Sequence, residues 1–179
     1  NKEEGFINIV HDPWRPVPSI GGHLSPTPGE ANRELIDMRG DVATFTSEPF
    51  AKGMVIESIP TLGIKAKADK EGFDICVALS VLFKNQKEVH QLSTGFLRII
   101  GGEAKSFTYR EIILQPFLAS FPKGSQIRLS ISGSCWPAIA INPGSTKNPC
   151  ISPNPNCCIT TISIDLSKSK LKFDPIFSN

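Results

Sequence analysis

The amino-acid sequence predicts an all-β domain, a mainly antiparallel β-sandwich or jelly roll, and three observations support this prediction. Apolar and polar residues alternate along many short stretches, which places the apolar set on one face of a sheet. The chain holds 14 Gly and 15 Pro, and they stand between these stretches, as turn residues do. Helical periodicity is nearly absent along the 179 residues. Sheets with one apolar face are expected to bury that face by packing on one another.

About nine short stretches are predicted as strands, with turn signals between them. The clearest alternation puts Ile127, Leu129 and Ile131 on one face and their polar neighbours on the other. Turn residues at hairpin spacing favour antiparallel pairing of successive strands. The predicted strands are residues 6–10, 42–46, 54–59, 62–68, 73–83, 89–100, 110–118, 126–132 and 161–166, and the predicted turns include Gly53, Pro60, Gly72, 84–86, 101–102, 122–124 and Gly133.

One helix is predicted, over residues 29–38, and it is too short to organise a core. Two long segments have no regular pattern, residues 12–39 and residues 135–158. Long irregular segments at the edge of a β-sandwich are expected to form a binding surface or to pack against another domain.

Length and composition predict one domain over residues 1–179, because 40% hydrophobic and 20% charged residues are typical of a globular protein. The 19 Lys and Arg and the 17 Asp and Glu are scattered singly, so neither nucleic acid nor an anionic membrane is expected as a partner. The absence of any apolar run of about 18 residues and of a leader pattern predicts no membrane span and no signal peptide. The first residue is Asn1 rather than Met, as expected of a fragment or a processed product.

The five cysteines are an odd set, which favours a reducing, cytoplasmic compartment and mostly free thiols. Cys76 lies in an apolar strand and is predicted to be buried. Three others, Cys150, Cys157 and Cys158, lie in a Pro-rich loop and are predicted to react quickly unless they pair. A disulfide between Cys150 and either Cys157 or Cys158 stays open, because the prolines bend the segment. The C-x6-C-C spacing disfavours a metal site, and the insertion 147–158 has no assigned role.

Catalytic machinery is not evident in the sequence. A serine nucleophile at a strand-to-helix elbow needs the pattern G-x-S-x-G, which does not occur. Ser134 and Cys135 follow a glycine, but the chain continues with Trp136 and Pro137, and neither a helix nor a base is near. A buried or turn-forming role is therefore favoured for both residues.

The histidines and acidic pairs also lack the spacing of a reactive or metal site. His11, His23 and His90 have no carboxylate or cysteine at metal-ligand spacing, and His90 is predicted to lie on the polar face of a strand. Asp69 and Asp74 bracket a turn, where solvated carboxylates are favoured over a calcium site. We assign no catalytic, cofactor-binding or metal-binding residue to this chain.

Several sequence motifs, in the same order along nearly the whole chain, resemble those of a known family. They are Trp14–Gly22, Arg39–Phe50, Gly72–Asp74 followed by Ile75–Val81, Thr94–Arg98, Phe121–Leu129, and Ser134–Pro137 with Asn142–Gly144. Together they are similar to the C-terminal domain of the X-prolyl dipeptidyl-peptidase, cocaine esterase and α-amino-acid ester hydrolase group, the CocE/NonD serine hydrolases. The departures fall at turns, where residues 84–86 replace an Asp-Gly turn and Ser125 replaces a His.

The resemblance implies a jelly roll of the galactose-binding-like type that follows an α/β-hydrolase domain upstream of Asn1. The Ser, Asp and His of that upstream domain would carry out acyl transfer on a peptide or ester substrate, so no catalytic residue is carried over to this chain. The resemblance also implies that the jelly roll packs on the hydrolase domain and shapes its acyl pocket. Trp14, Trp136 and Asn142 are the residues predicted at that interface.

Two other functions stay open at this point. A free-standing carbohydrate-binding module would stack sugars on exposed rings, for which Trp14, Trp136 and Tyr109 are available. A complete enzyme would need a nucleophile and a base that the sequence does not display. Trp136 itself has two interpretations, since its ring either contacts another domain or folds back onto the core of its own domain.

Overall fold

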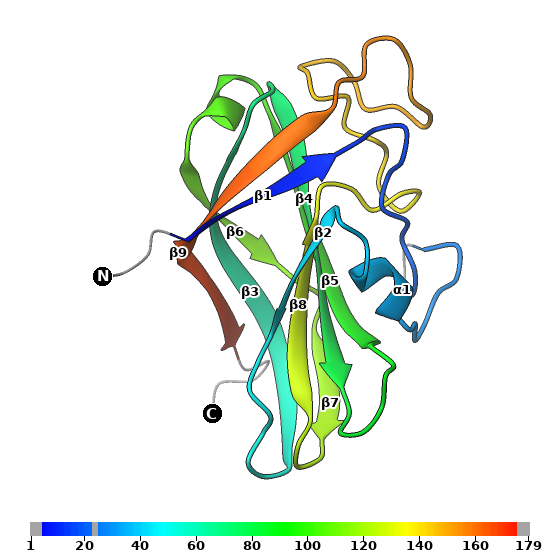
Figure 1. The fold of residues 1–179 in the computed structure, drawn as a ribbon, viewed down its shortest axis with the longest axis vertical. Coiled ribbons are helices and arrows are strands. Elements are labelled where there is room, and N and C mark those ends of the chain that lie inside the picture. Colours follow the sequence, from blue (N-terminus) through cyan, green and yellow to red (C-terminus); the bar gives the residue numbers. More distant parts are fainter. Residues whose placement is uncertain (1–4, 23–24, 175–179) are drawn as a thin grey trace.

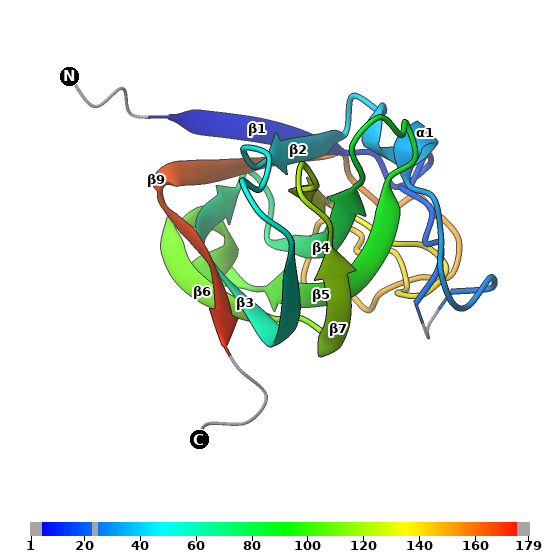
Figure 2. The ribbon, with the colours of Figure 1, turned by 90° about the horizontal axis from the view of Figure 1, so that it is seen from below.

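In the computed structural model, which describes residues 5–22 and 25–174, the chain forms two β-sheets that pack face to face (Figures 1 and 2). The strands are β1 (Phe6–His11), β2 (Val42–Thr46), β3 (Met54–Ala68), β4 (Gly72–Leu82), β5 (His90–Ile100), β6 (Thr108–Ile113), β7 (Phe117–Phe121), β8 (Gln126–Ser132) and β9 (Thr160–Asp174). The helices are α1 (Glu34–Asp37) and the 3-10 turn η1 (Gly102–Lys105). Within the described residues, neither has the length or the apolar character to cross a membrane.

One sheet has the order β1-β9-β3-β6, and β7 also pairs with β3, while the other has the order β2-β8-β4-β5. All pairs of named strands are antiparallel. The all-β, antiparallel sandwich predicted from the sequence is confirmed.

The core lies between the two sheets and comes from alternate residues of their strands. In β4, Phe73, Ile75 and Leu79 are each at most 1% exposed, and in β3 the same holds for Ile64. The inward set shares one continuous apolar cluster with residues of β1, β6, β8 and β9. Each fully buried Leu, Ile or Phe side chain contributes about 1.5–3 kcal/mol, which makes this cluster the main source of stability.

Three predicted strand boundaries are wrong, and two of these errors involve Pro60. Residues 54–59 and 62–68 form one strand, β3, with Pro60 inside it instead of in a turn. On one side, β3 changes its neighbour near Pro60, from β7 at residues 54–58 to β6 at residues 61–66. A residue without an N–H group fits at that gap in the ladder.

The predicted strand 110–118 is two strands, β6 and β7, separated by residues 114–116. Leu114 donates its backbone N–H to the carbonyl of Pro60 over 2.8 Å, so the break in one strand faces the proline of the other. The last strand, predicted over 161–166, extends to Asp174.

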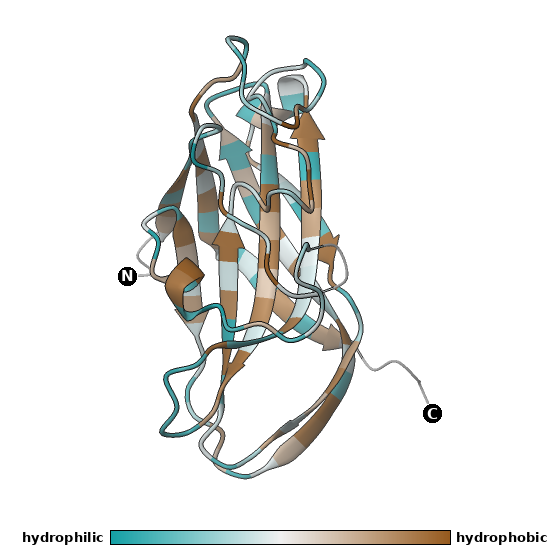
Figure 3. Ribbon diagram, turned by 90° about the vertical axis from the view of Figure 1, so that its right-hand side faces the viewer, coloured by the Kyte–Doolittle hydropathy of each residue, from teal (hydrophilic) through white to brown (hydrophobic). Residues whose placement is uncertain are grey.

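The two segments predicted to be irregular gather on one side of the molecule, to the right in Figure 1. In Figure 3, which faces that side, they cross in front of strands whose hydropathy alternates along their length. The predicted helix 29–38 is reduced to the single turn of α1. We call residues 12–22, 25–39 and 135–158 the loop layer.

Candidate functional site

The loop layer covers the outer face of β4, which is therefore buried on both sides. The outward residues Asp74, Cys76 and Ser80 are at most 5% exposed, although they point away from the sandwich core. Cys76 lies near Arg33 and Cys135, one from each half of the loop layer. The loop layer is thus a packed third layer whose inner side is buried against the sheet.

A charged cluster fastens residues 140–144 to the sheet. The Asp74 carboxylate accepts two hydrogen bonds from the Arg98 guanidinium, from Nε at 2.9 Å and from a terminal nitrogen at 2.6 Å. It also accepts one from the Asn142 side-chain amide at 2.8 Å. The bond to Asp74 raises the pKa of Arg98, and the same guanidinium donates to the Ala140 carbonyl. Asn142 Oδ1 accepts from the Gly144 N–H at 3.0 Å, which shapes the turn that follows.

A second buried cluster fastens residues 30–37. Arg33 is 6% exposed and donates to Asp37 over 3.3 Å and to the Gln91 side chain over 2.9 Å. Burial lowers the pKa of Arg33, and the neighbouring Asp37 opposes that effect. Asp37 lies 3.7 Å from Arg128 of β8 as well. Residues 30–37 also lie along the start of the edge strand β5, since the backbone N–H of Arg33 donates to the Val89 carbonyl at 2.8 Å.

The first half of the loop layer pairs with the segment that follows β8. The backbone N–H of Trp136 donates to the Val17 carbonyl over 2.9 Å, and the Trp136 carbonyl accepts from the backbone N–H of Ser19 over 2.7 Å. The hydroxyl of Ser134 accepts a hydrogen bond from the Val17 N–H at 2.8 Å, and Ser134 is 4% exposed. Burial raises the pKa of the Cys135 thiol, which is opposite to the shift that activates a nucleophile. Ser134 has the buried, turn-forming role that its sequence context favours.

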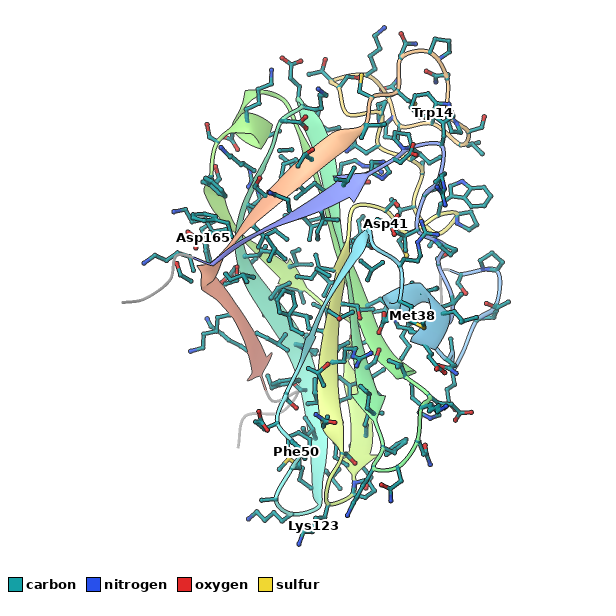
Figure 4. All side chains as sticks on the ribbon, in the orientation of Figure 1. Trp14, Met38, Asp41, Phe50, Lys123 and Asp165 are labelled. Carbon is teal, nitrogen blue, oxygen red and sulfur yellow. The ribbon has the colours of Figure 1, made fainter. Side chains whose placement is uncertain are left out.

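Two of the three predicted interface residues lie on the outer surface. Trp14 is 53% exposed, and Trp136 is 38% exposed while its indole N–H donates to the Ile151 carbonyl at 3.0 Å. The ring of Trp136 thus packs against the insertion and lies outside the core clusters. In Figure 4 the labelled Trp14 and Met38 both lie on the side of the loop layer.

Further exposed apolar residues on the loop layer were not singled out from the sequence. Leu35 and Ile151 are each 81% exposed and Met38 is 76% exposed. The sequence of these segments has no regular alternation of apolar and polar residues, so it does not indicate which side chains point outward. We call Trp14, Leu35, Met38, Trp136 and Ile151 the apolar patch.

Asn142 differs from the two tryptophans because it is 1% exposed. Its amide is used inside the domain, in the cluster with Asp74 and Arg98. Direct contact of this side chain with another domain therefore does not fit the structure. The sequence analysis did not predict that Asp74 and Arg98 form a buried ion pair, although both stand in motifs that carry the family resemblance.

A pocket of about 430 Å³ lies between the loop layer and β5. Gln91 and Thr94 contribute polar atoms, and the rest of the described lining is mainly apolar, including Phe96, Ile113 and Ile139. Cys135 is the one titratable residue among the described lining residues, and its pKa is raised. These residues offer an apolar concavity and no acid–base pair.

The histidines take different places. His11 is 3% exposed, with Nε2 at 3.4 Å from the Asn142 carbonyl oxygen, and burial lowers its pKa. His90, predicted on an exposed face, is half-buried and lies 2.6 Å from Glu30, because the loop layer covers the start of β5. His23 lies outside the described residues. Within the described residues no three His, Cys, Asp or Glu side chains are grouped as a metal site would need.

The acidic pair is separated by the fold. Asp69 lies in the hairpin between β3 and β4 and accepts from the Thr161 N–H at 2.8 Å. Asp74 is not in the turn but in β4, where it is 1% exposed. Solvation of both carboxylates, as predicted, is therefore wrong for Asp74, since the loop layer removes its outward side from water.

The cysteines are free in the described structure. Cys76 is 5% exposed, which confirms its predicted burial. Cys150 and Cys157 bring their sulfur atoms to 3.5 Å without a bond. Cys157 is 6% exposed, so the predicted fast reaction of this thiol does not fit its burial, whereas Cys158 is exposed as expected.

Solved structures share this fold. An aminopeptidase from the marine sediment archaeon Thaumarchaeota archaeon is 15% identical with a TM-score of 0.80, and the alignment covers 96% of this chain and 33% of that one. An α-amino acid ester hydrolase is 18% identical with a TM-score of 0.79, over 94% of this chain and 32% of that one. A CocE/NonD family hydrolase from Staphylococcus aureus is 16% identical with a TM-score of 0.54, over 74% of this chain and 30% of that one.

The chain therefore spans about a third of the length of the solved hydrolases that it matches. A comparison with curated protein sequences gives no match. The family comparison matches residues 9–170 to the X-Pro dipeptidyl-peptidase C-terminal non-catalytic domain. Because this match extends over nearly the whole chain, the protein belongs to the family of X-Pro dipeptidyl-peptidase C-terminal non-catalytic domains.

Proposed function

We propose that this domain packs, through its loop layer, on an α/β-hydrolase domain of the same polypeptide. The observation that carries the proposal is the apolar patch, in which two tryptophans, a leucine, a methionine and an isoleucine remain exposed on a loop layer that is otherwise tightly anchored. Exposed Trp and Met are enriched where proteins meet, and each large apolar side chain gains free energy when a partner removes it from water.

The anchoring of the loop layer supports this surface as a docking site. Two buried charged clusters, around Asp74 and around Arg33, hold the segments rigidly to the sheet. A rigid surface loses little conformational entropy when it binds, so more of its buried area contributes to affinity. A surface built in this way suits permanent contact with a neighbouring domain.

The reaction proposed for the whole protein is acyl transfer from a peptide or an ester. Three of the matched solved chains, of which the aligned part makes up 30–33%, are an aminopeptidase and two further hydrolases. We place the nucleophile, acid and base of that reaction outside this chain, and we expect this domain to shape the acyl pocket from one side. We also propose a cytoplasmic location, which the odd number of five cysteines supports.

The strand order supports classifying the sandwich as a jelly roll of the galactose-binding-like type. In the orders β1-β9-β3-β6 and β2-β8-β4-β5, the first and last strands pair, and the chain crosses between the sheets at every step except from β4 to β5 and from β6 to β7, as in two Greek keys. The alternative of a carbohydrate-binding module is less well supported. Tyr109 lies on β6, in the sheet opposite the loop layer, so it does not share one platform with Trp14 and Trp136.

Trp14→Ala in the isolated domain and in the full-length protein tests the proposal. Trp14 is half-exposed, so the isolated domain is expected to keep its melting temperature within about 2 °C. In the full-length protein the same change is expected to lower both the melting temperature and the thermal half-life of hydrolase activity. Trp136→Ala is expected to act similarly, with an added loss of about 1 kcal/mol in the isolated domain from the hydrogen bond to Ile151.

Tyr109→Ala is the matched control, because it removes an aromatic ring that is 49% exposed on the opposite sheet. Its effect is expected to be equal in the isolated domain and in the full-length protein. A Trp14→Ala variant that behaves like the Tyr109→Ala control in both contexts would show that the loop layer is not the interface. The isolated domain is also expected to hydrolyse neither proline nitroanilides nor simple acyl esters, and turnover that belongs to it would refute the non-catalytic role.

A further inference from the structure

The insertion places two thiols side by side at the rim of the loop layer. The sulfur atoms of Cys150 and Cys157 are 3.5 Å apart, although seven positions separate the residues. Cys150 is half-buried and Cys157 is 6% exposed, while the neighbouring Cys158 is exposed. The Cys158 sulfur points to a different acceptor, the Asn156 carbonyl at 3.9 Å. The pair is therefore specific to Cys150 and Cys157.

The backbone holds the two thiols together. Cys150 and Ile141 exchange two backbone hydrogen bonds, of 2.8 and 3.0 Å, in an antiparallel bridge. At the other end of the insertion, the Cys157 N–H donates to Asn154 and the Cys158 N–H to Pro143, each over 2.9 Å. Both ends of the insertion are thus tied to the segment 141–143, so the sulfur atoms meet because of the backbone path.

We propose that Cys150 and Cys157 form a reversible dithiol–disulfide site that responds to low-molecular-weight disulfides such as oxidised glutathione. The Cys150 thiolate attacks one sulfur of the small disulfide, which releases one glutathione thiolate and leaves a mixed disulfide on Cys150. The Cys157 thiolate then attacks the Cys150 sulfur and releases the second glutathione thiolate. The two protons lost by the protein thiols are taken up by the two glutathione thiolates. Two protein S–H bonds and the S–S bond of oxidised glutathione are broken, and one protein S–S bond and two glutathione S–H bonds are formed.

The site is joined to the exposed ring of Trp136. Ile151, the residue after Cys150, accepts the indole N–H of Trp136 at 3.0 Å. A bond between Cys150 and Cys157 closes a ring of residues 150–157 and restricts the segment that carries this acceptor. Oxidation is therefore expected to change the environment of the Trp136 indole, whereas Trp14 lies elsewhere in the loop layer.

The test titrates the whole chain with mixtures of reduced and oxidised glutathione and follows its mass and thiols. At oxidising ratios the protein is expected to lose two hydrogen atoms, and alkylation before digestion is expected to leave Cys150 and Cys157 protected and Cys158 labelled. Excess reduced glutathione is expected to reverse the change. The matched variant Cys158→Ser is expected to keep the mass loss, and Cys157→Ser to abolish it.

The second readout is the fluorescence of Trp136 in a Trp14→Phe variant, since the chain has two tryptophans. Its emission is expected to shift on oxidation in the Cys158→Ser background and to stay constant with Cys157→Ser. In the unaltered protein, a stable glutathione adduct without ring closure would overturn the proposal, as would a disulfide that requires Cys158. The mass map of the unaltered protein decides this even where Cys157→Ser fails to fold.

Discussion

Replacing Asp74 by Ala removes the carboxylate that joins the loop layer to the four-stranded sheet. The side chain of Asp74 is 2% exposed and that of Arg98 is 22% exposed, so the ion pair is largely buried. After the substitution the Arg98 guanidinium keeps, among the residues that the structure describes, the Ala140 carbonyl as its hydrogen-bond acceptor. The buried amide of Asn142 loses the acceptor that lies 2.8 Å away.

The cost follows from these two losses. Removing one partner of a buried ion pair costs about 3–5 kcal/mol, and the partial exposure of Arg98 favours the lower end. Leaving the Asn142 amide without an acceptor adds about 1–3 kcal/mol, although the two terms share one site and do not add fully. We therefore expect Asp74→Ala to lower the free energy of unfolding by about 3–5 kcal/mol, or the melting temperature by about 6–20 °C.

Urea unfolding of the isolated domain measures this loss, with Glu71→Ala as the control. Glu71 pairs with Lys105 at 3.2 Å, but the two side chains are 51% and 52% exposed. An exposed pair of this kind contributes about 0–1 kcal/mol. Trypsin cleavage at Lys147 is a second readout, because release of residues 140–144 is expected to expose the insertion in Asp74→Ala alone.

A loss for Asp74→Ala within about 1 kcal/mol of the Glu71→Ala value would refute the reasoning. It would mean that the loop layer is held by its backbone pairing, and that the buried cluster adds no net stability. An unchanged rate of cleavage at Lys147 would lead to the same conclusion.

Three further predictions concern buried or strained positions. Burial lowers the pKa of His11, so the unfolded chain binds a proton at higher pH than the folded chain does, and stability should fall as the pH drops below about 6.5. Thermal melts at decreasing pH should show a smaller fall in melting temperature for His11→Gln than for the unaltered domain. Cys76 is 5% exposed and burial raises its pKa, so iodoacetamide should label it far more slowly than Cys158, and equal rates would contradict its placement. Gly144 has φ 77°, and a Cβ there would lie 2.7 Å from a side-chain oxygen, so Gly144→Ala should cost about 2 kcal/mol or more in urea unfolding, whereas Gly40→Ala, with open space, should be neutral.

Much of the fold follows from local pattern. The alternation of residues 126–132 predicts β8, and the same rule predicts the inward faces of β4 and the first part of β9. The two boundary errors near Pro60 arise from rules that are correct locally but depend on the partner strand. Pro60 does not end β3, because its missing N–H falls where β3 passes from β7 to β6, and the register of those pairs is a long-range property.

Less of the candidate site could be predicted. Trp14 and Trp136 were predicted at an interface because they stand in motifs that carry the family resemblance, and the structure shows that both are exposed. Asn142 was grouped with them because it also stands in a motif that carries the resemblance, yet it is buried and bonded to Asp74. Distance along the chain carries no information on the direction of a side chain in a segment without a period.

Local sequence pattern was enough to predict which residues alternate and where turns are favoured. Tertiary structure alone decided that the loop layer covers β4, which turns a polar strand position at Asp74 into a buried anchor. It also decided that Cys150 approaches Cys157 rather than Cys158. Alternation and turn preference arise from residues that are close in the sequence, so a local pattern predicts them. Burial and pairing depend on segments that are far apart in the sequence, such as Asp74 and Asn142, which are separated by 68 positions.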